Sequence, residues 1–450
     1  MFTTVLIANR GEIALRIART CRDLGIRTVA VYSTADRDSA VTRFADESVH
    51  IGPPAAKYSY LNEAAIIEAA LRTGAEAIHP GYGFLSEDPL FAEACEAHGI
   101  RFIGPPTDVL ERLGDKARAR AVMAEAGLPV LPGSTFAAHG AVEAKQAADR
   151  IGYPVMIKAV AGGGGRGMTM VREARDFPRA YEGVRSDALA IFGDGRVYVE
   201  RALETTRHVE VQILADGHGT VVHLGARDCS PQRRRQKLVE ETPPPGLPDE
   251  LVERICAAAV HGARSVGYVG AGTFEFLVDE KLQFHFMEAN CRLQVEHPVT
   301  ELVSGIDLVR EQILVAAGAR LGYRDHPATT GVAIECRVNA EDPEHGFRPT
   351  PGTIDEFLPP GGPFTRVDTH CFAGMRIAAE YDPLLAKVAV WAPTRPQAIA
   401  RMERALSELV IRGRGVSTTV GFLRDILGHP LFRDAKHTTA LVEQMGPTRR

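Results

Sequence analysis

The stretch Glu288-Ala289-Asn290-Cys291-Arg292-Leu293-Gln294-Val295-Glu296 alternates polar residues with small or apolar ones. Successive side chains of an extended chain point to opposite faces, so the five polar residues would share one side. This row begins with two oxygen ligands suited to a hard cation, continues with a guanidinium suited to a small oxyanion, and ends with a carboxylate able to act as a base. The solvated face of an ordinary amphipathic strand is the alternative interpretation.

The residues before this stretch favour a site. The apolar run 284–287 and the segment 273–278 read as two strands joined by the short connection 279–282, which predicts a hairpin. The hairpin would place Glu275 opposite Glu288, about 5 Å apart. Two carboxylates that close repel each other unless a proton or a metal lies between them. With Asn290 nearby, we expect a magnesium or manganese site where this strand ends and a loop begins.

Composition restricts the class of protein. A length of 450 residues suggests two to four domains, and 45% hydrophobic with 24% charged residues is typical of a globular protein. The formal net charge of -5 and the absence of a basic block argue against nucleic acid as a partner. No apolar run has the length of a membrane span. The seven cysteines occur singly, without CxxC, so we expect neither disulfides nor zinc, and a reducing cytoplasm.

The N-terminal part reads as the opening of a parallel sheet. Val5–Ala8 is predicted as a buried strand, Ile13–Leu24 as a helix and Thr28–Tyr32 as a second strand. A dinucleotide site is not indicated, because the first turn carries only Gly11 and not G-x-G-x-x-G.

Residues 131–203 resemble an inserted unit, in which predicted strands at 153–160 and 168–171 flank the glycine run 161–167. Bare backbone amides can wrap an anion and the loop can act as a lid, although a flexible turn is the alternative. No Walker A sequence follows. We expect an antiparallel sheet over 204–300 and a third region from Gly331, with a helix at Pro396–Val410.

Further polar groups occur outside these segments. Asp115 is a predicted N-cap, and Lys116 in the first helical turn would be explained by an anionic ligand. The alternating residues His208, Glu210 and Gln212 are more often a surface than a site. By itself, the cationic run 227–237 reads as a solvated loop. Because the same chain carries a predicted metal pair and a glycine lid, the more economical hypothesis is that all three bind one triphosphate.

The whole chain resembles a biotin carboxylase, an enzyme of the ATP-grasp superfamily. The resemblance rests on Asn9–Ala14, His79–Glu87, the glycine lid, Arg227–Ser230, Gly272–Phe276 and Gln294–Glu301. It implies an α/β and α+β fold with a Rossmann-like N-terminal domain (1–112), a central ATP-grasp domain (113–330, lid 131–203) and a mixed C-terminal domain (331–446).

The resemblance also implies residue roles. Glu275, Glu288 and Asn290 would hold Mg²⁺ or Mn²⁺, Glu296 would deprotonate bicarbonate, and Arg337 would hold the biotin ureido oxygen. The nucleotide-binding residues would be Lys116, Lys158, Gly164, Gly165, Met168, Glu200, Arg201, Leu203, His208, Gln232, Arg235 and Leu277. The substrate-binding residues would be Lys237, Arg292, Gln294 and Val295 for bicarbonate, with Arg337, Tyr82 and Phe84 for biotin; Arg292, Glu296, Arg337 and Lys237 would be catalytic.

Three positions depart from the family pattern. Arg235 stands where a histidine is usual, Ala161 where a further glycine is common, and Cys291 where a threonine is usual. One competing hypothesis is a binding subunit in which Arg235 or Cys291 has disabled turnover. The other is an ATP-grasp carboxylate-amine ligase, which would share the lid and the metal glutamates. In the favoured reaction, ATP and bicarbonate would carboxylate biotin through carboxyphosphate.

The implied partners are a biotin carboxyl carrier protein and carboxyltransferase subunits, with a homodimer expected. Acetyl-CoA is the favoured final acceptor, and propionyl-CoA, pyruvate and urea systems are alternatives. None of the eight lysines lies between two methionines, and the chain ends soon after its last helix, so we expect that biotin is carried by another polypeptide.

Overall fold

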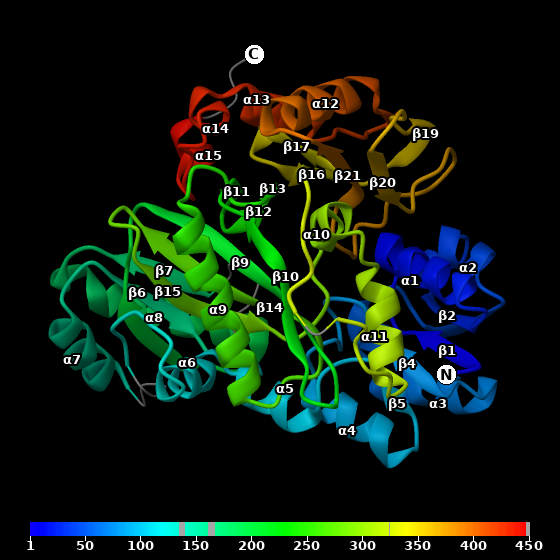
Figure 1. The fold of residues 1–450 in the computed structure, drawn as a ribbon, viewed down its shortest axis with the longest axis horizontal. Helices are drawn as coiled ribbons and strands as arrows, with labels where there is room; N and C mark the ends of the chain where they lie inside the picture. The colour runs from blue at the N-terminus through cyan, green and yellow to red at the C-terminus, as the bar shows by residue number, and fades with distance from the viewer. Residues whose placement is uncertain (135–139, 161–166, 324, 447–450) are drawn as a thin grey trace.

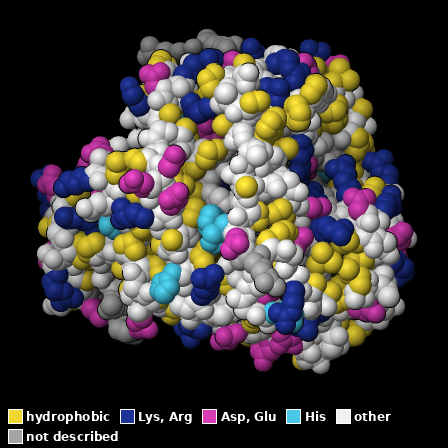
Figure 2. Space-filling model, viewed as in Figure 1, with side chains coloured by type: hydrophobic (Ala, Val, Ile, Leu, Met, Phe, Trp, Pro, Cys, Tyr) yellow, Lys and Arg dark blue, Asp and Glu magenta, His cyan; other side chains and the backbone are white. Residues whose placement is uncertain are grey.

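The computed structural model describes residues 1–134, 140–160, 167–323 and 325–446. In Figure 1 the N-terminal sheet lies on the right, the unit with α7 and α8 on the left, and the C-terminal helices along the top. A long central sheet lies between them. Figure 2 shows Lys and Arg side chains mixed with Asp and Glu over this face of the molecule.

The N-terminal sheet is parallel, with the order β3-β2-β1-β4-β5, which confirms the predicted βαβ opening. Val5, Leu6 and Ile7 are buried, as expected for a strand covered on both faces. The first helix spans Gly11–Asp23, two residues earlier at its start than predicted. The elements are β1 Thr4–Ile7, α1 Gly11–Asp23, β2 Arg27–Ser33, α2 Ala40–Phe44, β3 Glu47–Gly52, α3 Glu63–Thr73, β4 Ala77–His79, α4 Pro89–Ala97, β5 Arg101–Phe102 and α5 Thr107–Gly114.

The central sheet has eight antiparallel strands in the order β15-β14-β9-β10-β13-β16-β21-β20. The pairing of β13 with β16 joins the strands of residues 206–290 to those of 332–392. Arg337 and Glu275 therefore belong to one sheet, although the predicted domain boundary at 330/331 separates them in sequence. The strands are β9 Thr206–Ala215, β10 Val221–Asp228, β13 Val239–Thr242, β14 Gly270–Asp279, β15 Phe284–Asn290, β16 Val332–Asn339, β20 Thr365–Thr369 and β21 Leu384–Ala392.

The prediction of an antiparallel sheet throughout 204–300 was wrong at two places. Helix α9, Asp249–Ser265, lies between β13 and β14 and packs on β9 and β10. Its buried Leu251, Ile255 and Ala259 recur every four residues, the helical period that the sequence interpretation overlooked. Helix α10, His297–Ser304, begins directly after Glu296.

The unit on the left of Figure 1 is a three-stranded sheet with the order β7-β6-β8, packed against two helices around its own apolar core. Its second predicted strand is observed at the predicted residues, and the first is shorter than predicted. The glycine run, with Ala161, Gly164 and Gly165, lies outside the described residues. The elements are α7 Ala141–Ile151, β6 Val155–Ala159, β7 Met168–Val171, α8 Phe177–Phe192 and β8 Val197–Arg201.

The C-terminal part places α12, Arg395–Glu408, on the central sheet, close to the predicted helix at 396–410. Its stripe of Ile399, Met402 and Leu406 is buried, as predicted. No helix in the described ranges combines the length and the apolar character needed to cross a membrane. The remaining elements are α6 Lys116–Glu125, β11 Gln232–Arg233, β12 Gln236–Lys237, α11 Leu308–Ala316, β17 Glu341–Asp342, β18 Arg348–Pro349, β19 Thr353–Leu358, β22 Val410–Arg414, α13 Val420–Gly428, α14 Pro430–Arg433 and α15 Leu441–Gln444.

Candidate active site

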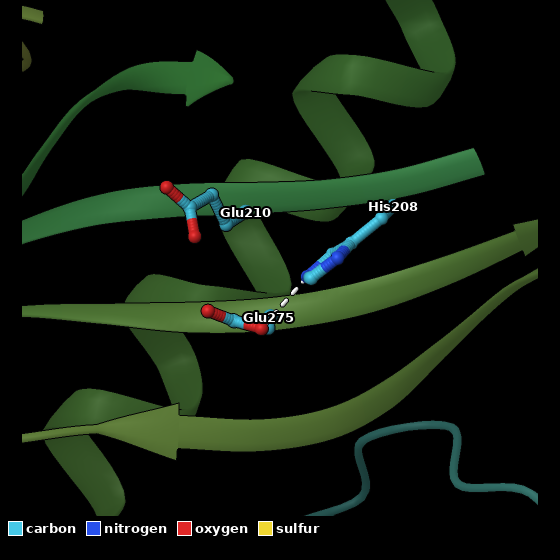
Figure 3. Close-up of side chains that lie close together, drawn as sticks. All are labelled: His208, Glu210 and Glu275. Carbon is cyan, nitrogen blue, oxygen red and sulfur yellow. Dashed lines mark hydrogen bonds and ion pairs between the residues drawn. The ribbon is translucent and has the colours of Figure 1, made fainter. Parts of the chain in front are cut away.

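The polar face of β9 is buried, contrary to the surface interpretation. His208, Glu210 and Gln212 are at most 6% exposed. Strand β14 pairs with β9 so that Glu275 lies opposite Glu210. Figure 3 shows His208 directed toward Glu275, and the His208 Nε2 to Glu275 Oε2 distance is 2.7 Å. Buried polar groups need partners, and here the neighbouring strands provide them.

The predicted hairpin is confirmed, and it places Glu275 opposite Glu288. Burial would raise the pKa of Glu275, but Lys237 and His208 lower it to about 2. Burial is likewise outweighed at Glu288, where the ion pair with Lys116 lowers the pKa to about 2. Asn290 donates from Nδ2 to Glu275 Oε1 at 2.8 Å. At neutral pH, two ionised carboxylates thus lie together with the Asn290 side chain beside them, and carboxylate and amide groups supply the oxygen ligands suited to Mg²⁺ or Mn²⁺.

Lys237 lies at the centre of the cluster, at the end of the short strand β12. Its Nζ is 2.6 Å from Glu210 Oε2, 2.9 Å from Glu275 Oε1 and 2.6 Å from Glu296 Oε1. Burial would lower the pKa of Lys237, but these carboxylates raise it well above its ordinary value. The lysine is therefore a fixed positive charge among three buried carboxylates.

Arg337, on β16, contacts the other side of Glu296. Its Nη2 is 2.7 Å from Glu296 Oε2, and its Nε donates to Glu240 Oε1 at 2.6 Å. Each carboxylate oxygen of Glu296 therefore has one cationic donor, Lys237 for Oε1 and Arg337 for Oε2. Strand β16 thus presents Arg337 to the carboxylates of Glu296 and Glu240.

Two further buried carboxylates lie beside Arg337. Glu240 and Glu335 are opposite each other on β13 and β16. Burial raises the pKa of Glu240 to about 7 and that of Glu335 well above its ordinary value. Among the described residues, neither oxygen of Glu335 has a hydrogen-bond partner. Burial without a hydrogen-bond partner therefore favours the protonated form of Glu335.

Arg292 follows the end of β15 and is held by a residue from the N-terminal part. Its Nε donates to Glu87 Oε2 at 2.7 Å, and the amide of Cys291 donates to Glu87 Oε1 at the same distance. Arg292 Nη2 is 3.4 Å from Asn290 Oδ1. One carboxylate thus orients both the guanidinium and the loop that carries it.

Three of the predicted nucleotide residues, Lys116, Lys158 and Glu200, take part in ion pairs. Asp115 caps α6, as predicted, and places Lys116 against Glu288. Lys158 on β6 contacts Glu200 on β8, and Arg120 contacts the same carboxylate. Burial lowers the pKa of Lys158 to about 7, with Lys116 adding to the effect. An anion bound here would favour the charged lysine.

The remaining predicted nucleotide residues have other surroundings. Arg201 Nη1 donates to the carbonyl of Gly152 at 3.0 Å, so its side chain is engaged with the chain after α7. Arg235 reaches the Sδ of Met156 at 3.4 Å and the carbonyl of Met168 at 3.5 Å, so it contacts the lid sheet directly. Gln232 is buried, and Leu203 and Leu277 are half-buried.

The two aromatic residues predicted near biotin have different surroundings. Tyr82 donates its hydroxyl hydrogen to Glu12 Oε1. Phe84 stacks on Tyr60, with ring centroids 5.1 Å apart, and packs on the core. Tyr82 therefore contacts the buried carboxylate of Glu12, whereas the contacts of Phe84 are apolar.

Sequence reasoning assigned no role to several residues that hold the site together. Glu87, Glu240 and Lys387 were not assigned, and the cationic run that begins at Arg227 was read either as a solvated loop or as part of a triphosphate site. Arg227 is fully buried, with Nε 2.5 Å from Glu210 Oε1. The apolar residues that precede Arg227 continue a strand into it, and this continuity was the available signal that the residue is covered.

Family models cover most of the chain. The biotin carboxylase N-terminal domain matches residues 1–110, the ATP-binding domain of the carbamoyl-phosphate synthase L chain matches 115–324, and the biotin carboxylase C-terminal domain matches 335–444. The two flanking matches favour a biotin carboxylase over a carboxylate-amine ligase.

Individual relatives agree over the full length. The biotin carboxylase of Nostoc sp. is 52% identical over 99% of both chains, and a pyruvate carboxylase subunit of Methanothermobacter thermautotrophicus is 49% identical over 99% of this chain and 90% of its own. The biotin carboxylase domain dimer of Hydrogenobacter thermophilus 2-oxoglutarate carboxylase, in complex with MgADP, ADP and bicarbonate, has a TM-score of 0.96 at 47% identity, covering 99% of this chain and 98% of its own. This chain therefore belongs to the biotin carboxylase family and is an ATP-dependent enzyme that carboxylates biotin with bicarbonate.

Proposed function

We propose that the buried cluster around Glu296 is where bicarbonate is activated. The observation that carries this proposal is the pair of cationic donors on Glu296, Lys237 at Oε1 and Arg337 at Oε2. A base held at both oxygens is preorganised, and the same cations attract a small oxyanion. Arg292, oriented by Glu87, adds a third cation on the approach to Glu296.

Glu275, Glu288 and Asn290 would hold Mg²⁺ or Mn²⁺, which offsets negative charge on the triphosphate. Lys116 and Lys158 line the same side and would contact phosphate oxygens, replacing their present contacts with Glu288 and Glu200. The low pKa of both glutamates supports this assignment, because metal ligation needs the ionised form.

In the first step, Glu296 removes the bicarbonate proton while Lys237 and Arg292 hold the anion against the γ-phosphate of ATP, giving carboxyphosphate and ADP. Carboxyphosphate then breaks down beside Arg337 into CO2 and inorganic phosphate. In the second step, the released phosphate takes the N1 proton of biotin, Arg337 stabilises the negative charge that develops on the ureido oxygen, and N1 forms a bond to CO2. A preorganised donor of this kind typically contributes about 10² to 10³ in rate.

The bicarbonate assignment is tested with Arg292→Ala. We expect the KM for bicarbonate to rise at least about tenfold, since a hydrogen bond to a charged group contributes about 1.5 to 3 kcal/mol. The KM for ATP should change less than about threefold. Arg310→Ala, at an exposed arginine of α11, is the matched control. Equal increases in both KM values would remove Arg292 from the bicarbonate site.

We further propose that this chain acts on biotin attached to a separate carrier protein and serves a carboxyltransferase, with acetyl-CoA as the favoured acceptor. The similarity to pyruvate and 2-oxoglutarate carboxylase subunits keeps other acceptors open. We also propose a homodimer, supported by the dimer of the Hydrogenobacter domain, and a cytoplasmic location, which remains a prediction from cysteine usage.

These assignments have direct tests. Carrier-bound biotin should be carboxylated much faster than free biotin at equal concentration, because tethering raises the local concentration to about millimolar. Labelling of this chain itself by a biotin ligase, or equal rates with the two forms of biotin, would contradict the carrier proposal. Light scattering on the purified chain tests the dimer, and identification of the co-purifying transferase identifies the acceptor.

A further inference from the structure

Lys387 is a fully buried lysine that the proposed reaction does not use. It lies on β21, next to β16, where it is opposite Arg337 in the register and is 0% exposed. A lysine is almost never fully buried unless its ammonium is paired. Its contacts therefore indicate what the protein gains from placing it there.

The ammonium of Lys387 contacts three different parts of the chain. Its Nζ is 3.1 Å from Glu12 Oε1 on α1, and 3.8 Å from Asp368 Oδ2 on β20. It also donates to the carbonyl oxygen of Val295 at 2.9 Å. Asp368 already accepts two hydrogen bonds from Arg366, so Glu12 is the carboxylate that balances the charge of Lys387.

The contact with Val295 bears on the site. Val295 immediately precedes Glu296, and the peptide unit between them is planar. A charge-assisted hydrogen bond to the Val295 carbonyl therefore fixes the orientation of the unit that carries the Glu296 nitrogen and Cα. Lys237 and Arg337 hold the carboxylate of Glu296, so its backbone and its side chain are fixed from opposite ends.

We propose that Lys387 is a positioning residue for Glu296, holding the Val295–Glu296 peptide unit so that the carboxylate meets bicarbonate between Lys237 and Arg337. The inference rests on the proposed role of Glu296 as the base. Glu12 balances the charge of Lys387 and thereby lets the ammonium remain buried. The N-terminal helix α1 thus contributes to the geometry of a site built on the central sheet.

A purely structural ion pair between Glu12 and Lys387 is the competing explanation. The two are separated by measuring bicarbonate-dependent ATP cleavage, without biotin, in Glu12→Gln, Lys387→Met and the double variant. Glu12→Gln keeps Lys387 and its bond to Val295 but removes the carboxylate that balances the ammonium, so its melting temperature should fall. Lys387→Met leaves the carboxylate of Glu12 buried without its cation, so it tests folding together with positioning. The double variant removes both charges, so no uncompensated charge remains buried.

We expect Glu12→Gln to retain activity within about fivefold. The double variant should melt at least as high as either single variant, because neither buried charge is left unpaired. Its kcat/KM for bicarbonate should nevertheless be about 10²-fold lower than that of the wild type, the scale of a displacement of about 1 Å. Its affinity for ADP should stay within about threefold of wild type. Activity of the double variant equal to that of Glu12→Gln, or a loss of ADP affinity in proportion to activity, would overturn the inference.

Glu296→Gln, assayed alongside, separates this inference from the proposed function. Full activity in Glu296→Gln would contradict the role of the base itself. Loss of activity in Glu296→Gln together with a fully active double variant would contradict only the role of Lys387.

Discussion

Lys237 and Glu296 form an ion pair in the interior of the protein, with Nζ 2.6 Å from Oε1. Lys237 reaches Glu296 from the strand β12, and Glu296 lies where α10 begins, 59 residues later. The same ammonium holds Glu210 and Glu275. A single cation therefore connects the proposed base with Glu275, one of the proposed metal ligands, and this connection makes several variants informative.

Replacing the base should abolish one activity and spare another. In Glu296→Gln the amide keeps an oxygen acceptor for Lys237 or Arg337 but cannot take a proton. We expect bicarbonate-dependent ATP cleavage to fall by at least about 10², the lower range for general base catalysis. ADP affinity should stay within about threefold. Phosphate release and ADP titration measure the two effects, with the exposed Glu250→Gln as control; near-normal turnover would remove Glu296 from the mechanism.

Removing the cation on the biotin side should uncouple the two steps. In Arg337→Ala, ATP cleavage with bicarbonate should persist at a slow rate, because Lys237 still holds Glu296. Carboxybiotin formation should fall by at least about 10², the scale of one lost donor. Labelled bicarbonate fixed into biotin, compared with phosphate release, measures the ratio. Arg412→Ala, at an exposed salt bridge on β22, is the control. An equal loss of both activities would instead place Arg337 in the phosphate site.

Lys237 should be important for stability as well as for catalysis. Lys237→Met leaves Glu210, Glu275 and Glu296 without their shared ammonium. Breaking a buried ion pair typically costs about 3 to 5 kcal/mol. The control is Lys145→Met, which removes an exposed ion pair with Asp149 on α7; solvent screens such a pair, so its loss should change stability little. Thermal unfolding of both variants should show a clear loss only for Lys237→Met, and similar melting temperatures would contradict the buried network.

Stability should depend on pH through Glu335. Because burial raises its pKa in the folded state, the folded protein binds more protons than the unfolded chain above about pH 4.3. Stability due to Glu335 therefore falls as the pH rises toward the folded-state pKa. Glu335→Gln removes this fall, so its melting temperature relative to wild type should increase between about pH 5 and pH 8.

The control for this experiment is Glu356→Gln, whose carboxylate on β19 is 44% exposed and pairs with Arg412. Its melting temperature relative to wild type should be nearly independent of pH over the same range. A Glu335→Gln difference that is also independent of pH would show that Glu335 is ionised in the folded protein.

The features that the sequence determined by itself are local ones. The hairpin of β14 and β15 needed only two apolar runs and a short connection, and it set Glu275 opposite Glu288 without any distant contact. Asp115 as the cap of α6, the βαβ opening and the end of β15 at Asn290 depend on neighbours within a few residues. The motifs, read together, were enough to identify the family.

The tertiary structure alone decided which polar residues are buried and which partners they have. His208 and Glu210 read as surface residues because alternation shows that a face is polar, not whether it is covered. Arg227 opens a cationic run, and such a run likewise does not show whether its residues are buried. The partners of the buried residues come from distant parts of the chain. Strand β13 pairs with β16, Glu87 accepts a hydrogen bond from Cys291, 204 positions away, and Lys387 donates one to Val295, 92 positions away. These long-range contacts follow from how sheets and helices pack, and a buried charge is stable only where they bring a partner within hydrogen-bond distance.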